Sequence, residues 1–218
     1  MDFSLARSNM VEQQVRPWDV LDMRVLEVMA ALPREHFVPE GREGLAYADV
    51  EIPLGQGEFM LAPKVVGRLL QALAPVHSDR ALEVGTGSGY VTACLARLAA
   101  RVDSVERIDA LRLAARSRLD ALGVNNAQLR TGTVTRSWSP PGSRYDVISV
   151  NGAMHEYDPF LQPYLSLGGR LFVVVGTPPV MEALLVIRVA EDSYRTEMLF
   201  ETSMKPLVGF ERRPEFVF

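Results

Sequence analysis

Cysteine is nearly absent from the sequence: Cys94 is the only one among 218 residues. An intramolecular disulfide and a cysteine-rich metal site are therefore excluded, and such usage is typical of a protein kept in a reducing compartment. The three histidines and the acidic residues form no cluster with the spacing of metal ligands. We expect no metal site.

Long apolar runs are also missing. No stretch approaches the roughly 20 apolar residues that a membrane-spanning helix needs, and residues 1–16 are polar, without the apolar core of a signal sequence. The formal net charge is -4, so the sequence gives no electrostatic reason to expect a nucleic acid or an anionic membrane as a partner. We therefore expect a cytoplasmic protein that binds neither.

Internal repeats, low-complexity tracts and long Gly/Ser linkers are absent as well. A chain of 218 residues suits one α/β domain better than two. We expect a single domain over residues 1–218. Within it, residues 1–79 form an N-terminal helical region and residues 80–218 form the α/β core.

The N-terminal region carries apolar residues at helical spacing over residues 10–14 and 20–32. Pro33 ends the second of these predicted helices, because proline has no N–H and disfavours helix in the residue before it. A further helix is predicted over residues 63–73, with Pro63 in its first turn. Between residues 36 and 63, scattered Gly and Pro predict loops with short strands.

The core carries short apolar runs that alternate with helical segments. Such alternation implies right-handed crossovers and a mostly parallel sheet. Two late runs flank a polar turn at residues 191–193 and predict an antiparallel hairpin. The expected fold is an open, mostly parallel, doubly wound α/β sheet with an antiparallel edge hairpin. Strands are expected at 80–84, 102–106, 127–130, 145–150, 170–175, 183–189 and 195–201, and helices at 90–98 and 108–122.

A glycine-rich loop lies where the first parallel strand passes into a helix: Gly85, Gly87 and Gly89. Glycine there allows positive φ and lets a ligand lie against bare backbone, and in open α/β sheets ligands bind beyond the carboxyl ends of the strands. A tight turn would also explain the glycines alone. Glu106, however, ends the next strand about 20 residues on, where an acidic side chain can accept hydrogen bonds from ribose hydroxyls.

The spacing of the loop distinguishes between cofactors. A dinucleotide fingerprint needs a small sixth residue, but the sixth residue counted from Gly85 is the large Tyr90. A phosphate-binding P-loop is excluded because no Gly-Lys-Ser/Thr follows. The pattern G-x-G-x-G preceded by the acidic Glu83 instead resembles motif I of class I methyltransferases, which use S-adenosylmethionine.

Methyl transfer from such a cofactor is an in-line displacement at a sulfonium. The enzyme mainly aligns donor and acceptor and excludes water. A carboxylate acceptor is already ionised at pH 7 and needs no general base. We therefore assign no catalytic residue, and the absence of an obvious base does not argue against this activity.

Pieces along nearly the whole chain resemble, in order, the protein-L-isoaspartate (D-aspartate) O-methyltransferase family. Motif I alone is shared by many methyltransferases, so the ordered N-terminal pieces carry the specificity of the resemblance. The matching pieces are residues 10–13, 24–26, 32–34, 37–39, 46–49, 52–55, 82–90, 105–108, 145–148, 167–170 and 205–207.

The resemblance implies an S-adenosylmethionine-dependent O-methyltransferase that acts on a carboxylate of a protein or peptide. It also implies a cofactor site and an acceptor site, and it makes residues 1–79 the region that carries the substrate loop. The residues expected to hold the cofactor are Glu83, Gly85, Thr86, Gly87, Gly89, Glu106, Arg107 and Thr133. Those expected to border the acceptor are Met60, Leu61, Asn151 and Leu207.

The sequence departs from the family mostly on the acceptor side. Where the family has G-Q-T-I-S-x-P, with its serine at the reaction centre, this chain has Phe59 at the threonine and Leu61 at the serine. Thr133 replaces the aspartate that meets the adenine, and Val208 replaces a C-terminal threonine. Leucine offers no hydrogen bond. A different acceptor, or a non-catalytic module that binds S-adenosylmethionine or a partner, therefore remains an alternative.

Overall fold

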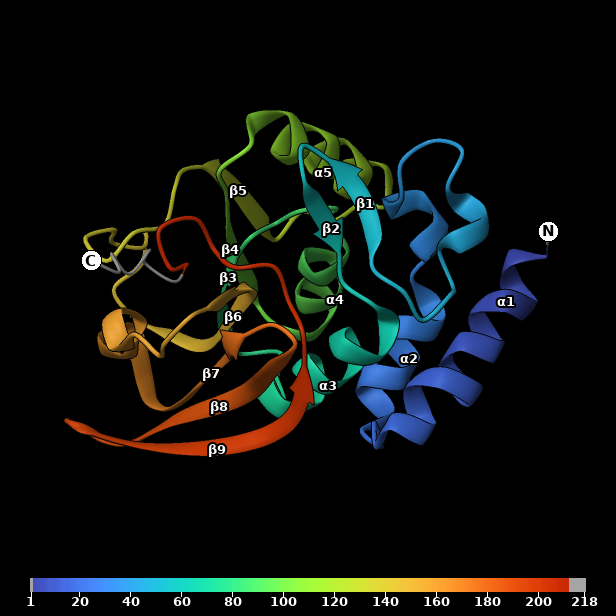
Figure 1. The fold of residues 1–218 in the computed structure, drawn as a ribbon. Helices are drawn as coiled ribbons and strands as arrows, with labels where there is room; N and C mark the ends of the chain where they lie inside the picture. The colour runs from blue at the N-terminus through green and yellow to red at the C-terminus, as the bar shows by residue number, and fades with distance from the viewer. Residues whose placement is uncertain (1, 212–218) are drawn as a thin grey trace, which may run out of the picture.

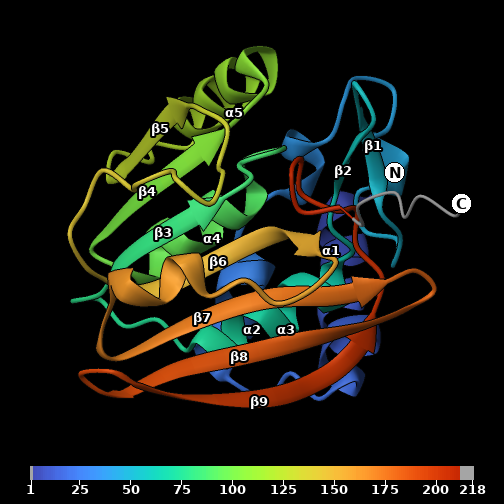
Figure 2. The same cartoon turned by 60° about the vertical axis from the view of Figure 1, so that its left-hand side comes forward.

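The computed structural model describes residues 2–211 and contains a sheet of seven strands in the order β5-β4-β3-β6-β7-β8-β9. The first five in this order run parallel, and β8 and β9 are antiparallel to their neighbours (Figure 2). This confirms the predicted open, mostly parallel sheet with an antiparallel edge hairpin. The strands are β3 (Arg80–Val84), β4 (Arg101–Glu106), β5 (Ala127–Thr131), β6 (Tyr145–Met154), β7 (Leu165–Thr177), β8 (Val180–Ala190) and β9 (Ser193–Thr202).

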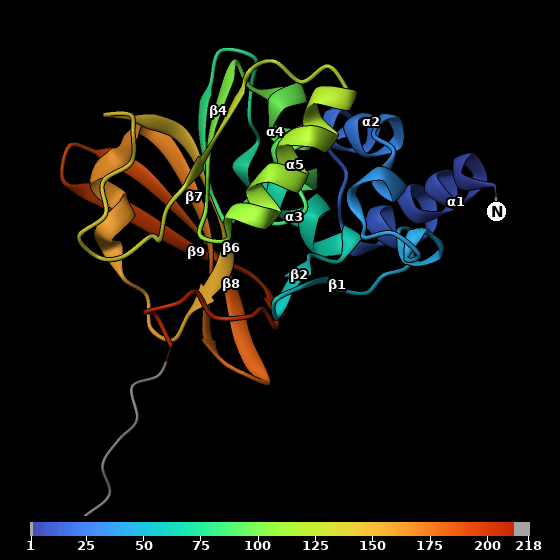
Figure 3. The ribbon, with the colours of Figure 1, turned by 90° about the horizontal axis from the view of Figure 1, so that it is seen from above.

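The helices that connect the strands cover mainly one face of the sheet. Helices α4 (Tyr90–Leu98) and α5 (Asp109–Ala121) follow β3 and β4, and α3 (Pro63–Leu73) packs beside them against β6 and β7. The opposite face is covered by the short helix η5 (Pro159–Tyr164) and by irregular chain (Figure 3). The chain order reverses between β3 and β6, which places the ligand crevice expected of such sheets at the carboxyl ends of these two strands.

The N-terminal helices form an outer layer beyond α3 and α4 (Figure 1). Helix α2 begins three residues later than the sequence suggested, because the Asp22 carboxylate caps it by accepting a hydrogen bond from the Arg24 N–H at 2.9 Å. No helix within residues 2–211 combines the length and the apolar character needed to cross a bilayer. The segments are α1 (Phe3–Met10), η1 (Val11–Val15), η2 (Arg16–Trp18), α2 (Met23–Ala31), η3 (Arg34–Phe37) and η4 (Glu43–Leu45).

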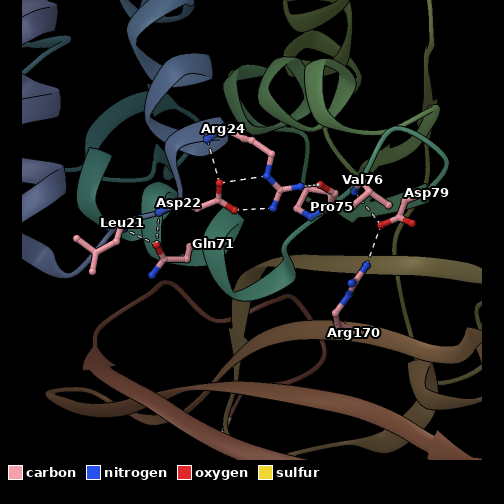
Figure 4. A network of polar contacts seen from close by, with 8 residues as sticks. All are labelled: Leu21, Asp22, Arg24, Gln71, Pro75, Val76, Asp79 and Arg170. Carbon is pink, nitrogen blue, oxygen red and sulfur yellow. Dashed lines mark hydrogen bonds and ion pairs between the residues drawn. The ribbon is translucent and has the colours of Figure 1, made fainter.

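Figure 4 shows the polar network that ties this outer layer to the sheet. The Gln71 side chain of α3 accepts a hydrogen bond from the Asp22 N–H at 2.9 Å, and Arg24 donates to a main-chain carbonyl in the loop between α3 and β3. In the same loop Asp79 forms an ion pair with Arg170 of β7 at 2.8 Å. These contacts fix the approach of the chain to β3, the strand that leads into the glycine loop.

Strands β6 and β7 are longer than the sequence predicted. The prediction ended the first at residue 150 and began the second at residue 170. Beyond residue 150, the pairing of β6 with β3 has ended and that with β7 continues, after an irregularity in register between Ser149 and Ala153. The alternating pattern is interrupted there, so the continuation is visible only once the partner strand is in place.

A two-stranded hairpin, β1 (Ile52–Gly55) and β2 (Glu58–Met60), stands at the carboxyl edge of the parallel strands (Figures 1 and 2). Its turn consists of Gln56 and Gly57, with φ of 52° and 76°. Positive φ at both central residues matches the turn that suits the twist of a hairpin. The loops with short strands expected between residues 36 and 63 are thus present, and they overhang the crevice.

Gly67 provides a test of the packing between α3 and the N-terminal layer. A Cβ at this position would lie 2.7 Å from the buried Val15 Cγ1 and 3.1 Å from Val20 Cγ2. Overpacking costs about 1–3 kcal/mol, whereas Gly→Ala in a helix gains up to about 1 kcal/mol. Gly67→Ala should therefore lower the free energy of unfolding in urea. Gly44→Ala, where nothing lies within 4 Å of the added carbon, is the control, and a stabilised Gly67→Ala protein would contradict the packing.

Candidate functional site

Two adjoining chambers form a cleft at the carboxyl ends of β3, β4 and β6. The larger encloses about 720 Å³, partly open to solvent, and the smaller about 470 Å³. Because the chambers share part of their lining, we treat them as one cleft with two ends. The shared residues are Glu58, Phe59, Leu61, Gly85, Glu106 and Asn151.

The glycine loop forms the floor of the cleft. Gly85, Gly87 and Gly89 have φ of 91°, 52° and 88°, a backbone region that residues with a Cβ rarely adopt. Gly85 and Gly87, two of the residues predicted to hold a cofactor, line the cleft. Gly89 does not: a Cβ there would lie 3.0 Å from the Cβ of Ala115 in α5. Gly89 therefore serves the close packing of the loop on α5.

Glu106 stands at the point where the two chambers meet. Its carboxylate accepts hydrogen bonds from the N–H groups of Gly87 and Ile108, each at 2.9 Å. A carboxylate offers about four acceptor sites, so lone pairs remain for a ligand. The two main-chain bonds fix the carboxylate before any ligand arrives.

Glu83, predicted to contact a cofactor, lies behind the cleft and does not line it. Its side chain is 0% exposed, and its carboxyl accepts from Thr92 Oγ1 at 2.5 Å, Ser104 Oγ at 2.6 Å and Asn151 Nδ2 at 2.9 Å. Burial raises the pKa of Glu83 to about 7, against the effect of these hydrogen bonds. Asn151 lines both chambers and also donates to the Gly85 carbonyl at 3.0 Å. Glu83 thus acts on the cleft through Asn151.

Thr86 and Thr133, also predicted, lie at opposite ends of the cleft. Thr86 lines the smaller chamber, and its hydroxyl shares a hydrogen bond of 2.5 Å with Ser104. Thr133 lines the larger chamber, beside the buried, apolar Val105 and Val134. The larger chamber therefore combines apolar walls with a few polar groups, which suits the ring system of a nucleoside.

The segment after β9 forms the outer wall of the larger chamber. It runs beside the end of β6, where the Ala153 N–H donates to the Lys205 carbonyl at 2.9 Å and the Leu207 N–H donates to the Ala153 carbonyl at 2.8 Å. Leu207 lies so close to β6 that a Cβ at Gly152 would be 2.6 Å from its Cδ2. The predicted residue Leu207 is therefore part of the cleft.

Ion pairs at Glu58 of β2 close the rim of the cleft. Its Oε1 lies 2.5 Å from Arg107 Nη2 and 2.7 Å from Lys205 Nζ. Partial burial opposes ionisation, but the hydrogen bonds and charges of Lys205 and Arg107 lower the pKa of Glu58. Arg107, predicted as a cofactor residue, lines the larger chamber while paired in this way. The hairpin, the end of β4 and the last segment are thereby joined.

The hairpin side of the cleft is apolar. Met60 lines the smaller chamber, Leu61 lines both, and Phe59 lies at the rim with 43% of its surface exposed. The main-chain oxygen of Leu61 accepts a hydrogen bond from the buried Arg34 at 2.6 Å. The structure therefore brings together Met60, Leu61, Asn151 and Leu207, the four residues predicted to border an acceptor.

Sequence reasoning assigned no role to several residues that line the cleft. Arg34 and Tyr90 lie in the wall of the smaller chamber, and Glu58 and Lys205 at the rim. Arg34, Tyr90 and Lys205 belong to pieces of the chain that resemble the family, and this resemblance was the one signal that could have identified them. Among residues 2–211, no group of three or more His, Cys, Asp and Glu residues is placed to hold a metal ion.

Comparisons with known proteins identify the family of the chain. The family model described as protein-L-isoaspartate (D-aspartate) O-methyltransferase matches residues 6–212. Protein-L-isoaspartate O-methyltransferase 1 of Rhodopseudomonas palustris is 39% identical over 96% of this chain and 85% of its own length. Protein-L-isoaspartate O-methyltransferase 2 of Pelobacter propionicus is 39% identical over 94% of this chain and 91% of its own.

A solved structure shares the fold. It is described as a protein-L-isoaspartate O-methyltransferase from Plasmodium falciparum in complex with S-adenosyl-L-homocysteine. The two chains superpose with a TM-score of 0.77 over 92% of this chain and 97% of that one, at 19% identity. At this identity the likeness concerns the fold alone.

The raised pKa of Glu83 predicts a pH-dependent stability. The carboxyl titrates near 4.5 in the unfolded chain, the usual pKa of glutamate, and near 7 in the folded protein. Between these pH values the folded state holds a proton that the unfolded chain has lost. The contribution of Glu83 to the free energy of unfolding is therefore complete below pH 4.5 and is lost as the pH rises to 7. The loss is on the order of 3 kcal/mol. Glu83→Gln stays neutral, so urea unfolding should show the wild-type protein losing stability relative to the variant over this range. A constant difference between pH 4.5 and 8 would contradict the buried, neutral carboxyl.

Proposed function

The chain belongs to the protein-L-isoaspartate (D-aspartate) O-methyltransferase family, and from this membership we propose that it transfers a methyl group from S-adenosylmethionine to a carboxylate of a protein or peptide. The observation that carries the proposal is the two-ended cleft, in which Glu106 stands where the glycine loop meets the larger chamber. We place this activity in the cytoplasm, in keeping with the single cysteine.

The residues of the cleft fit the cofactor. Glu106, already fixed by two main-chain N–H groups, would accept hydrogen bonds from the ribose hydroxyls. Thr133, Val105 and Val134 would enclose the adenine in the larger chamber. The bare backbone of Gly85 would let the remainder of the molecule pass into the smaller chamber.

When bound, the cofactor supplies a methyl group on a sulfonium, which a carboxylate oxygen of the acceptor takes to give a methyl ester and S-adenosylhomocysteine. The chain aligns the two reactants and excludes water. The apolar Met60, Leu61 and Leu207 would shield the acceptor carboxylate from solvent. No residue needs to remove a proton, because the acceptor is ionised at neutral pH.

A second candidate is a non-catalytic module that binds S-adenosylmethionine. The observation that favours it is the side chain of Leu61, which lines both chambers and offers no hydrogen bond to an acceptor. Both candidates require the cofactor to bind, and methyl transfer separates them.

Calorimetry with S-adenosylmethionine and S-adenosylhomocysteine tests the binding of the cofactor. Glu106→Gln should weaken the affinity for both by about 1–3 kcal/mol, because an amide replaces the charged acceptor of the ribose hydroxyls. Glu27→Gln is the matched control: Glu27 is exposed on α2 and lines neither chamber, so the affinity of this variant should stay near wild type. If folded wild-type protein bound neither compound at millimolar concentration, both candidates would be refuted.

Methyl transfer to an isoaspartyl peptide tests the acceptor, with the same peptide carrying normal aspartate as the reference. Leu61→Ser should raise kcat/KM for the isoaspartyl peptide about tenfold, because the hydroxyl gives the buried carboxylate a hydrogen-bond partner. Leu61→Ala removes bulk without adding a hydroxyl and is the matched control. An equal gain in kcat/KM in both variants would show that the smaller side chain, and not the hydroxyl, causes the effect. Tight cofactor binding without transfer to any carboxylate, in wild type and Leu61→Ser alike, would favour the non-catalytic module.

A further inference from the structure

Arg34 is a fully buried cation in the wall of the smaller chamber. Its side chain is 0% exposed, although it lies in the short helix η3 just after Pro33. Two of its three nitrogens donate hydrogen bonds: Nε to the Ala46 carbonyl at 2.7 Å and Nη2 to the Leu61 carbonyl at 2.6 Å. The third, Nη1, has no hydrogen-bond partner within residues 2–211.

No anion balances this charge within the described residues. The groups that act on Arg34 are Tyr90, Cys94 and Tyr47. Burial raises the pKa of Cys94 and of Tyr47 to about 12 and that of Tyr90 well above its usual value, so all three are neutral at pH 7. Burial also lowers the pKa of Arg34, but a guanidinium keeps its proton in proteins. None of the ion pairs formed by the described residues includes Arg34.

A buried cation without an anion beside it destabilises the folded protein unless a ligand supplies the anion. The cause is the large desolvation penalty of an unpaired buried charge. The cation–π contact with the Tyr90 ring, whose centroid lies 4.7 Å from Arg34 Cζ, offsets part of this penalty. The Tyr90 hydroxyl is itself buried without a partner and belongs to the same chamber wall. A carboxylate is the ligand that would accept from both the guanidinium and the phenol.

We propose that Arg34, together with the hydroxyl of Tyr90, binds the α-carboxylate of the amino-acid part of S-adenosylmethionine. This inference rests on the proposed function. With the ribose at Glu106 and the adenine in the larger chamber, the amino-acid part is what enters the smaller chamber. That chamber is lined by Thr86 and Ser88 of the glycine loop as well as by Arg34.

The same guanidinium holds the main-chain oxygen of Leu61, which borders the acceptor side. Binding of the donor's carboxylate and placement of the acceptor wall are therefore linked through one side chain. Arg34 thus binds the donor directly and also holds in place the segment that follows the hairpin.

The first test uses the wild-type protein and changes only the ligand. Calorimetry compares S-adenosylhomocysteine with its decarboxylated analogue, which keeps the amine, and with 5′-methylthioadenosine, which lacks the amino-acid part. Loss of the carboxylate should weaken binding about ten- to hundredfold, as expected for a charged hydrogen bond. Equal affinity for S-adenosylhomocysteine and its decarboxylated analogue would overturn the inference.

The second test changes the protein. Arg34→Met should weaken S-adenosylhomocysteine about ten- to hundredfold, while 5′-methylthioadenosine and the decarboxylated analogue bind as they do to wild type. Arg34→Lys, which keeps the charge, should retain more of the affinity than Arg34→Met. A similar loss for all three ligands would show that Arg34 acts only through Leu61. If Arg34→Met does not fold, the ligand comparison in wild type decides. Failure of wild type to bind even 5′-methylthioadenosine would instead refute the proposed function.

Discussion

The carboxyl group of Glu83 is the point at which the elements around the cleft are joined. It lies in β3 and accepts hydrogen bonds from side chains of α4, β4 and β6. Since a buried polar group left without its partner costs about 1–3 kcal/mol, none of these elements shifts independently. Asn151 also donates to the Gly85 carbonyl, and it thereby connects this hydrogen-bond network to the lining of the cleft. The glycine loop is therefore held by a group that does not touch the cleft.

Groups of opposite charge lie at different places along the cleft. The Glu106 carboxylate lies where the two chambers meet, and the Arg34 guanidinium lies in the wall of the smaller chamber. A molecule with hydroxyl donors in its middle and a carboxylate at one end matches this order in one direction only. The rim is separate from both, because Glu58 pairs there with Arg107 and Lys205. The proposed recognition of the donor and the ion pairs that hold the hairpin thus use different charged groups.

The sequence predicted the fold and most residues around the cleft, since strand–helix alternation and the glycine spacing are local patterns. Glu83 and Gly89 were predicted with them, but their contacts depend on Ser104 and Ala115, which other elements bring close. No local pattern could show that Arg34 lacks an anion, because that depends on what surrounds it in space. The extension of β6 beyond residue 150 likewise depends on its pairing with β7. Direct contacts with the cofactor stay a prediction.

The wall built by residues 204–208 comes from the last part of the chain that the structure describes. During synthesis, the glycine loop and the strands on both sides of it leave the ribosome long before this wall. A nascent chain can therefore form most of the parallel sheet while its cleft is still open on one side. A ligand that prefers the native state shifts the folding equilibrium toward it, so S-adenosylmethionine bound in the completed cleft would stabilise the finished protein.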